Sequence, residues 1–471
     1  MAAGRQRIDL TEGPIVGNLL RFAVPILLGT IVTQLYNVAD SMIVGRFVGA
    51  DALAAVSAGS PVMSLINLFM IGLAAGSGVV IAQRVGARNL DALQKAVSTV
   101  AFLTLACSLF ITAVGLAVTQ PLLSLLGTPE KIFADSRAYL IIVYLGTTGN
   151  MVYQMGSGVL RGMGDSGWPF LFLLVCSLLN VVLNLVAVLA LGWGVAGVAA
   201  ATAAAQLVSG AGILLRLNRG GYGVRIGPGT LKPDRTEAGK IIGIGLPAAI
   251  QNVGNSIAAL CVQSSVNFFG PSFIAANSIV TKVDDVINIP VIALSTALCT
   301  FVGQNMGCFR MDRIRRGINT SILSLTVLGF GMCGLLILLR GVFPRVFTTD
   351  ETVIAMAADG ILIMSFQCLF HGTDRCLVNA MRGAGKSVVP MVTAQFGAFS
   401  RIPLAWLLGV RTGDWHGIFL ALLIASFLRS AAIAAYYYCG GWKRAVEKYE
   451  RRHAAEKPDG SKRPASEAGT Q

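Results

Sequence analysis

The chain contains a series of apolar segments long enough to cross a lipid bilayer, separated by glycine, proline and charged residues. An α-helix needs about 20 consecutive apolar residues to span the hydrocarbon of a bilayer. Charged residues make up only 13% of the chain and the mean hydropathy is +0.70, whereas soluble domains carry about 25% charged residues. A membrane β-barrel would show short segments of alternating polarity instead. The sequence therefore predicts an all-α integral membrane protein.

Twelve transmembrane helices are expected from the spacing of these segments. They begin near residues 15, 52, 95, 132, 168, 195, 239, 272, 316, 352, 386 and 415. A cytoplasmic N-terminus places most of the 37 Lys and Arg residues on the inner side, as the positive-inside rule requires. We therefore expect both termini in the cytoplasm and attribute the net charge of +14 to this asymmetry rather than to a nucleic-acid partner. The first apolar run is too long for a cleavable signal peptide, so it is expected to remain as the first helix.

An internal duplication relates the two halves of the sequence. The stretch "AQRVGARNLD" aligns with "GQNMGCFRMD", which pairs Gln83 with Gln304, and "LRGMGDS" aligns with "MRGAGKS", which pairs Arg161 with Arg382. Both pairs are 221 residues apart, and "FVGADALAA" and "FFGPSFIAA" share that offset. Six spans in each copy give the two halves the same orientation. The duplication therefore predicts two six-helix lobes related by a pseudo-two-fold axis along the membrane normal, with a central cleft, as in transporters.

Four segments follow from this reading of the sequence. An N-terminal lobe is expected over residues 1–217, a basic cytoplasmic linker over 218–238, a C-terminal lobe over 239–440 and a disordered polar tail over 441–471. The tail is rich in charged and small residues and cannot bury enough apolar surface to fold.

Enzyme and cofactor signatures are missing from the sequence. The nine cysteines are scattered singly and the three histidines are dispersed, so neither a disulfide framework nor a metal site is expected. The segment "RGAGKS" resembles the end of a phosphate-binding loop, but Ala380 stands where that motif needs glycine. We expect no enzyme activity and no cofactor. Transport by such a chain would have to draw on an ion gradient.

Asp40 is a carboxylate near the outer end of the first apolar segment, where a charge is costly and points to function. Asn180 and Asn184 lie one helical turn apart on the fifth helix, and Thr202 lies at a similar depth on the sixth. These four side chains can converge into a cation-coupling site. The alternative for Asp40 is a structural pair with Arg46 at the interface.

Pro25 lies fifteen residues before Asp40 in the same predicted helix. Proline removes a backbone hydrogen bond and kinks a helix. Pro25 is therefore a candidate hinge, with a static kink as the alternative.

Several of these motifs together resemble the multidrug and toxic compound extrusion (MATE) family, in its prokaryotic DNA-damage-inducible-F-like branch. They are "VPILLGTIVTQLYNVADSMIVGRFVGADALAAVS", the two "RGxG" turns, "GQNMG" and "GWGVAGVAAATAAAQ". The resemblance covers nearly the whole chain apart from the tail. It implies an antiporter of the bacterial or archaeal cytoplasmic membrane that exports organic, often cationic, compounds in exchange for H⁺ or Na⁺, through two rocking lobes.

The resemblance also implies residue roles. Asp40 matches the cation-coupling aspartate of the family, and Asn180 and Thr202 match its polar partners, while the first helix bends as the aspartate is protonated. Asn184 departs from the pattern, because the branch usually has a second aspartate there. A single carboxylate halves the charge available to hold Na⁺, so we expect H⁺ to be the coupling ion.

The second half does not repeat this site, since the 221-residue offset places Arg401 opposite Asn180. Asp284, His371 and Asp374 add polar groups in the predicted eighth and tenth helices. At helical spacing His371 can pair with Asp374, and Lys282 can pair with Asp285. We interpret these residues mainly as a network that stabilises the second half. Asp284 and Asp374 are also candidate second proton or substrate sites.

An adaptable apolar cleft could accept flat organic cations by dispersion and cation–π contacts. The residues predicted to line it are Tyr36, Met63, Phe69, Met70, Tyr139 and Met155. The main alternative function is a flippase for lipid-linked precursors. A pyrophosphate headgroup would call for several basic residues facing the cleft. A monomer in the lipid bilayer is expected in either case.

Overall fold

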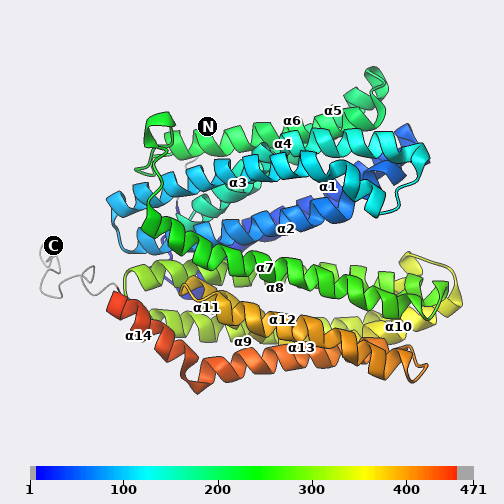
Figure 1. Ribbon diagram of the computed structural model, residues 1–471. Coiled ribbons are helices and arrows are strands. Elements are labelled where there is room, and N and C mark those ends of the chain that lie inside the picture. Colours follow the sequence, from blue (N-terminus) through cyan, green and yellow to red (C-terminus); the bar gives the residue numbers. More distant parts are fainter. Residues whose placement is uncertain (1–6, 453–471) are drawn as a thin grey trace, which may run out of the picture.

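The computed structural model describes residues 7–452, and all regular structure in that part of the chain is helical. Figure 1 shows two bundles that pack along one side of each other. The first bundle contains α1 (Ile15–Ile43), η1 (Val44–Val48), α2 (Ala50–Gly86), α3 (Leu90–Leu125), α4 (Glu130–Gly162), α5 (Gly167–Leu185), η2 (Val186–Ala190) and α6 (Gly194–Arg219).

The second bundle follows a linker that includes η3 (Pro228–Thr230). It contains α7 (Arg235–Asn267), α8 (Pro271–Gly307), α9 (Met311–Leu339), η4 (Pro344–Val346), α10 (Glu351–Ser365), α11 (Cys368–Gly383), α12 (Val388–Ala405), η5 (Trp406–Val410), α13 (His416–Tyr436), η6 (Tyr437–Gly441) and α14 (Trp442–Arg452). The carboxylate of Asp234 accepts hydrogen bonds from the backbone of Thr236 and Glu237 and so caps α7. These donors lower the pKa of Asp234, because they favour its charged form.

The chain is an all-helical membrane protein. In the described residues, nine helices are long and apolar enough to cross a bilayer, or ten if α10 and α11 form one span. Twelve helices were expected from the sequence, and the two additional ones correspond to α4 and α12. The observed starts of the long helices lie within a few residues of the expected positions.

The structure adds detail to the sequence prediction at two places. The predicted tenth helix is divided into α10 and α11, whose axes differ by 49° across a short break. The tail expected to be disordered from residue 441 is helical as far as Arg452, because Trp442 is buried against the core of the second bundle and packs on the ring of Tyr437. Residues 453–471 of the predicted tail lie outside the described part of the chain.

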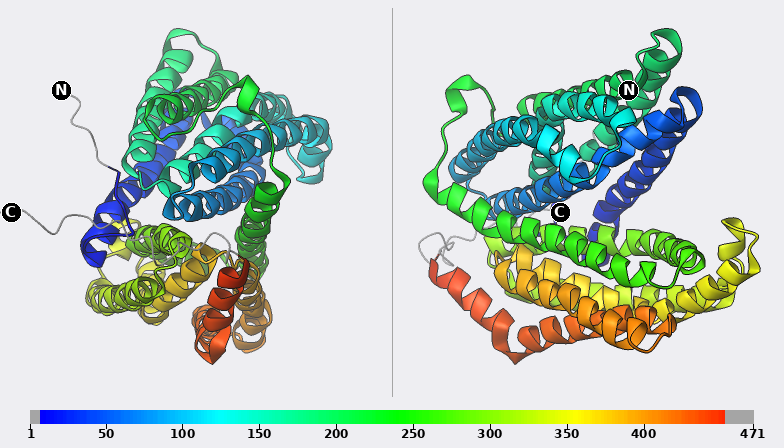
Figure 2. Two further views of the ribbon diagram at one scale, coloured as in Figure 1. Left: turned by 90° about the vertical axis from the view of Figure 1, so that its left-hand side faces the viewer. Right: turned by 45° about the vertical axis from the view of Figure 1, so that its right-hand side comes forward.

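The two bundles meet most closely at the end of the molecule that carries residues 220–234, which we call the linker end (Figure 1, left; Figure 2). The amide of Gln83 donates to the carbonyl of Gly383 at 3.0 Å, and the amide of Gln304 donates to the carbonyl of Gly162, also at 3.0 Å. Gln83 and Gln304 are partners in the sequence duplication, as are the two glycines. Each bundle therefore donates the same hydrogen bond to the other.

Glycine allows the backbones of α2 and α8 to approach at this end. A Cβ atom on Gly86 would lie 1.9 Å from the carbonyl oxygen of Gln304, and one on Gly307 would lie 2.1 Å from that of Gln83. No side chain can occupy such a space. The duplicated glycines are therefore required by the contact between bundles rather than by the helices that contain them.

A segment before α1 covers the same contact. The backbone amide of Ile8 donates to Gly164 in the first bundle, and that of Leu10 donates to Gln304 in the second bundle. Asn305 returns a hydrogen bond to the carbonyl of Leu10, whose side chain is fully buried. The linker end is thus closed by interactions that join both bundles to the N-terminal segment.

Candidate functional site

Asp40 lies at the end of a chain of polar side chains inside the first bundle. The Asn184 amide donates to the Asp40 carboxylate at 2.7 Å and to the side-chain oxygen of Asn180 at 2.9 Å. The Asn180 amide donates in turn to the Thr202 hydroxyl at 3.1 Å. The structure therefore brings together the four residues that the sequence predicted would converge from the first, fifth and sixth helices.

The hydrogen-bonded side chains from Asp40 to Thr202 lie in a largely buried environment. Asn180 and Asn184 are 1% and 0% exposed, and Asp40 is half-buried. The side-chain oxygen of Asn184 is buried without a hydrogen-bond partner among the described residues. The phenol groups of Tyr36 and Tyr139 lie within electrostatic range of the carboxylate. The site therefore combines one carboxylate with a buried acceptor that has capacity for a further donor or a cation.

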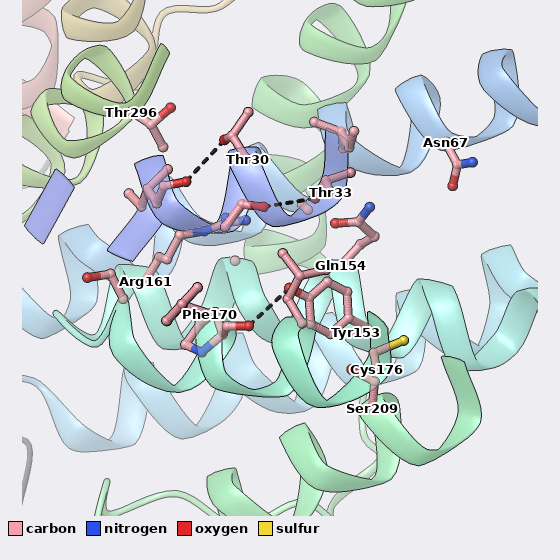
Figure 3. A pocket seen from close by; sticks show the side chains of 18 of the residues that line it. Thr30, Thr33, Asn67, Tyr153, Gln154, Arg161, Phe170, Cys176, Ser209 and Thr296 are labelled. Atoms are coloured by element: carbon pink, nitrogen blue, oxygen red, sulfur yellow. Dashed lines mark hydrogen bonds between the residues drawn. The ribbon is translucent and has the colours of Figure 1, made fainter. Parts of the chain in front are cut away.

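A cavity of about 590 Å³ adjoins this site (Figure 3). Tyr36, Asn180 and Thr202 line it, so the polar chain opens onto the cavity, and Pro25 lies in its wall. Its walls come from α1, α2, α4, α5 and α6 in the first bundle, and from α8 and α11 in the second. Movement of one bundle relative to the other would therefore change its shape.

The residues predicted to line an apolar cleft are divided between the cavity wall and the core of the first bundle. Of the six proposed residues, only Tyr36 lines the cavity. Met70 and Met155 are each 1% exposed in the core of the first bundle. The other three, Met63, Phe69 and Tyr139, also pack against buried clusters. Sequence alone could not separate these roles, because core and cavity walls use the same apolar residue types.

The two arginines of the duplicated "RGxG" turns, which were not predicted as site residues, also line the cavity. Arg161 is in the last turn of α4 and Arg382 is in the last turn of α11. The signal that could have found them was their duplication, since the two are partners at the 221-residue offset.

The polar residues of the second bundle pair differently from the prediction. His371 donates through Nδ1 to the side-chain oxygen of Asn288 at 2.9 Å, and not to Asp374. Asp374 instead forms an ion pair with Arg429 at 2.8 Å, with both side chains less than a tenth exposed. The three-residue spacing within α11 would allow Asp374 to pair with His371, but Asp374 pairs with Arg429 of α13 instead. A guanidinium is the stronger partner for a buried carboxylate.

The remaining charges of the second bundle surround this ion pair. Arg375 and Arg401 interact electrostatically with both Asp284 and Asp374. The expected contact between Lys282 and Asp285 is an electrostatic interaction only, because no ion pair between them is formed among the described residues. The polar interior of the second bundle is therefore built mainly from arginine and aspartate, and Arg401 is the member that stands opposite an amide of the first bundle, Asn180.

A known family model matches this chain twice, once in each half of the duplication. Residues 25–186 and residues 247–407 each match the MatE family model, and together they cover more than half of the chain. The chain belongs to the MatE family of membrane transporters. It is therefore not an enzyme. The two matches begin at Pro25 and Pro247, the prolines inside α1 and α7.

Relatives of this MatE protein span almost its whole length. It is 28% identical over 440 residues to the probable multidrug resistance protein YoeA of Bacillus subtilis, covering 90% of this chain and 93% of YoeA. It is 26% identical to the FAD transporter of Shewanella oneidensis, covering 92% of this chain and 96% of that protein. Its fold is similar to the crystal structure of MATE in the bent conformation, with a TM-score of 0.86 at 21% identity over 95% of this chain and 99% of the other.

The ion pair of the second bundle gives the first testable prediction. Asp374→Asn should lower the free energy of unfolding by about 3 to 5 kcal/mol, because it leaves buried guanidinium groups without their carboxylate. The double variant Asp374→Leu with Arg429→Met should recover part of that loss, since it removes the guanidinium paired with Asp374, while Arg375 and Arg401 still lose their interaction with this carboxylate. Unfolding of the purified protein in detergent measures these changes.

The control is Glu351→Gln, which breaks the exposed pair with Arg345, where the side chains are 63% and 74% exposed. It should change stability by less than about 1 kcal/mol. If Asp374→Asn is as stable as this control but no longer transports, the ion pair has a role in transport rather than in holding the bundle together.

Proposed function

We propose that this MatE protein is a secondary antiporter that exports drug-like organic compounds in exchange for inward H⁺. The observation that supports this most directly is the hydrogen-bonded chain from Asp40 to Thr202, which joins a carboxylate within a membrane helix to a cavity between two bundles. YoeA is named a probable multidrug resistance protein and the Shewanella relative an FAD transporter, and both names are consistent with transport of organic molecules.

The architecture that accompanies this proposal has twelve spans in two six-helix lobes. The lobes would cover residues 1–217 and 239–440, be joined by a cytoplasmic linker at 218–238, and be related by an axis along the membrane normal. The protein would belong to the DNA-damage-inducible-F-like branch and act as a monomer in the bacterial or archaeal cytoplasmic membrane, with both termini inside. On this orientation the linker end faces the cytoplasm, and the contacts of Gln83 and Gln304 must break for the cavity to open inward.

The coupling step follows from the chemistry at Asp40. When the carboxylate is ionised it accepts a hydrogen bond from the Asn184 amide. A protonated carboxyl is a donor, and the unpartnered side-chain oxygen of Asn184 is a buried acceptor that a rotation of the amide would present to it. Protonation would therefore reverse a hydrogen bond between α1 and α5 without leaving the proton unpartnered. Each proton that enters contributes about 2.3 kcal/mol per 100 mV of membrane potential.

The polar residues of the second bundle have a supporting role in this proposal. Asp284, His371, Asp374 and Arg401 would mainly stabilise the bundle, with Asp284 and Asp374 as candidates for a second proton site. The substrate was expected from the sequence to be cationic. The two arginines in the cavity wall would repel a cationic substrate. Because guanidinium groups bind phosphate, they also strengthen the alternative function, a flippase for lipid-linked precursors.

Asp40→Asn tests the assignment of the coupling site. The amide keeps the shape of the side chain but cannot exchange a proton, so gradient-driven export should fall to the level of empty vesicles. Dye efflux from proteoliposomes with an imposed pH gradient measures this. Normal efflux by the variant would contradict the assignment, and the Asp51→Asn variant, which removes a mostly exposed carboxylate paired with Lys131, serves as a control.

Pro25→Ala tests the hinge. Alanine restores a backbone donor to α1 and removes the clash of the proline ring with the preceding turn, so the helix should bend less readily. Turnover should fall by a larger factor than equilibrium binding of the substrate weakens, because Pro25 also lies in the cavity wall. Equal transport rates in wild type and variant would mean that Pro25 is a static kink.

Asn184→Asp tests the choice of ion. Two carboxylates in one pocket repel each other unless a cation lies between them, so the variant should gain dependence on Na⁺. The wild type should export its substrate on a pH gradient alone. Efflux from proteoliposomes with each gradient imposed singly decides this. Wild-type efflux that follows Na⁺ and ignores pH would show that the neutral oxygen of Asn184 suffices as a Na⁺ ligand.

A further inference from the structure

The charge of the cavity differs from what export of organic cations would require. Among the described residues that line it, the charged ones are Arg161 and Arg382, and none is Asp or Glu. Asp40 lies beyond this lining and is reached through Asn180 and Asn184. A bound cation would therefore meet two positive charges directly in the cavity wall.

Neither arginine forms an ion pair with a carboxylate within residues 7–452. The described residues contain no ion pair to Arg161, and Figure 3 shows its side chain extending toward the α1 segment that carries Thr30 and Thr33. Arg382 donates one hydrogen bond, at 2.9 Å, to the neutral side chain of Gln251, while its Nε group is buried without a partner. A buried guanidinium normally has an anion or several acceptors, because an unpaired charge inside a membrane protein is costly. The two groups therefore have unused capacity to bind an anion.

The origin of the two arginines adds a geometric argument. They are partners in the duplication, so each bundle contributes one guanidinium from the last turn of equivalent helices. A ligand that binds both must contact both bundles. Guanidinium groups bind phosphate and carboxylate oxygens through paired hydrogen bonds.

The rest of the lining indicates what such an anion is attached to. Tyr36, Tyr153 and Phe170 present aromatic rings, and amides such as Gln34 and Asn150 add neutral donors and acceptors. Aromatic side chains bind planar rings by stacking. We infer that the cavity binds planar organic compounds that carry a phosphate or carboxylate group, and that Arg161 and Arg382 supply the positive charge that attracts the anionic group. This inference rests on the proposed function, since it names the class of compound that the antiporter would export.

A matched pair of probes tests the inference. Flavin mononucleotide and riboflavin share one planar ring system and differ by a phosphate, so fluorescence titration of the purified protein isolates the contribution of the anionic group. The wild type should bind the mononucleotide about tenfold or more tightly than riboflavin, because hydrogen bonds to charged groups are stronger than neutral ones. Arg161→Gln and Arg382→Gln should each reduce this preference, and the double variant should remove it.

Two further variants separate charge from fold. Gln251→Glu keeps the shape of the contact with Arg382 but supplies a carboxylate that neutralises it, so the preference for the mononucleotide should fall although both arginines remain. Arg219→Gln removes an exposed arginine at the end of α6, outside the cavity, and should leave the preference unchanged. Equal affinities of the wild type for the two flavins, or an unchanged preference in Gln251→Glu and in the double variant, would overturn the inference.

Transport distinguishes failure of the inference from failure of the proposed function. Proton-driven export of the cationic dye ethidium, without any preference for the mononucleotide in binding, would overturn the inference and leave the antiporter intact. Arginine-dependent binding without gradient-driven export of any probe would support the inference and refute the antiporter. Dihexanoyl phosphatidic acid is a competitor that carries a lipid headgroup phosphate without a planar ring. If it displaces the mononucleotide at concentrations far below the dissociation constant of the mononucleotide, the arginines bind a lipid headgroup and the aromatic part of the inference is overturned.

Discussion

The structure depends on satisfying polar groups inside an apolar environment. Charge in a membrane helix costs about 2.5 to 3.5 kcal/mol on insertion scales, and lipid offers no hydrogen bonds to offset it. Asp40 meets this requirement through Asn184, and Asp374 meets it through Arg429. In both cases the partner comes from another helix, so each buried polar group fixes the position of two helices. The functional groups and the packing of the bundles are therefore determined by the same contacts.

Duplication gives the two bundles a common frame and different interiors. The frame is retained at the linker end, where Gln83 and Gln304 make equivalent hydrogen bonds and glycines allow the backbones to meet. The interiors have diverged, since Arg401 stands at the position equivalent to Asn180. The second bundle also contains the buried ion pair of Asp374 and Arg429, whereas the residues 221 positions earlier, in the first bundle, are Tyr153 and Val208. A symmetric frame with an asymmetric interior allows one bundle to carry the coupling site while both contribute to the cavity between them.

The candidate site was predictable where residue type and helical spacing suffice. A carboxylate in an apolar segment is conspicuous, and two asparagines one turn apart share a face, so Asp40, Asn180, Asn184 and Thr202 could be expected to meet. The bend between α10 and α11 was not predictable in this way, because the apolar pattern continues through it. The hydrogen bond of His371 was also not predictable from helical spacing, since its partner Asn288 is 83 residues away in the sequence.

The sequence by itself determined that this protein is a duplicated bundle of membrane helices with a carboxylate in the first one, because apolar segment length, repeat offset and isolated charge are properties of the chain. Only the tertiary structure decided which side chains face the cavity. Met70 and Arg161 both lie on long helices of the first bundle, yet the apolar one is buried in the core and the charged one lines the cavity. The direction of a side chain relative to a cavity depends on how several helices pack around it, and no spacing within a single helix contains that information.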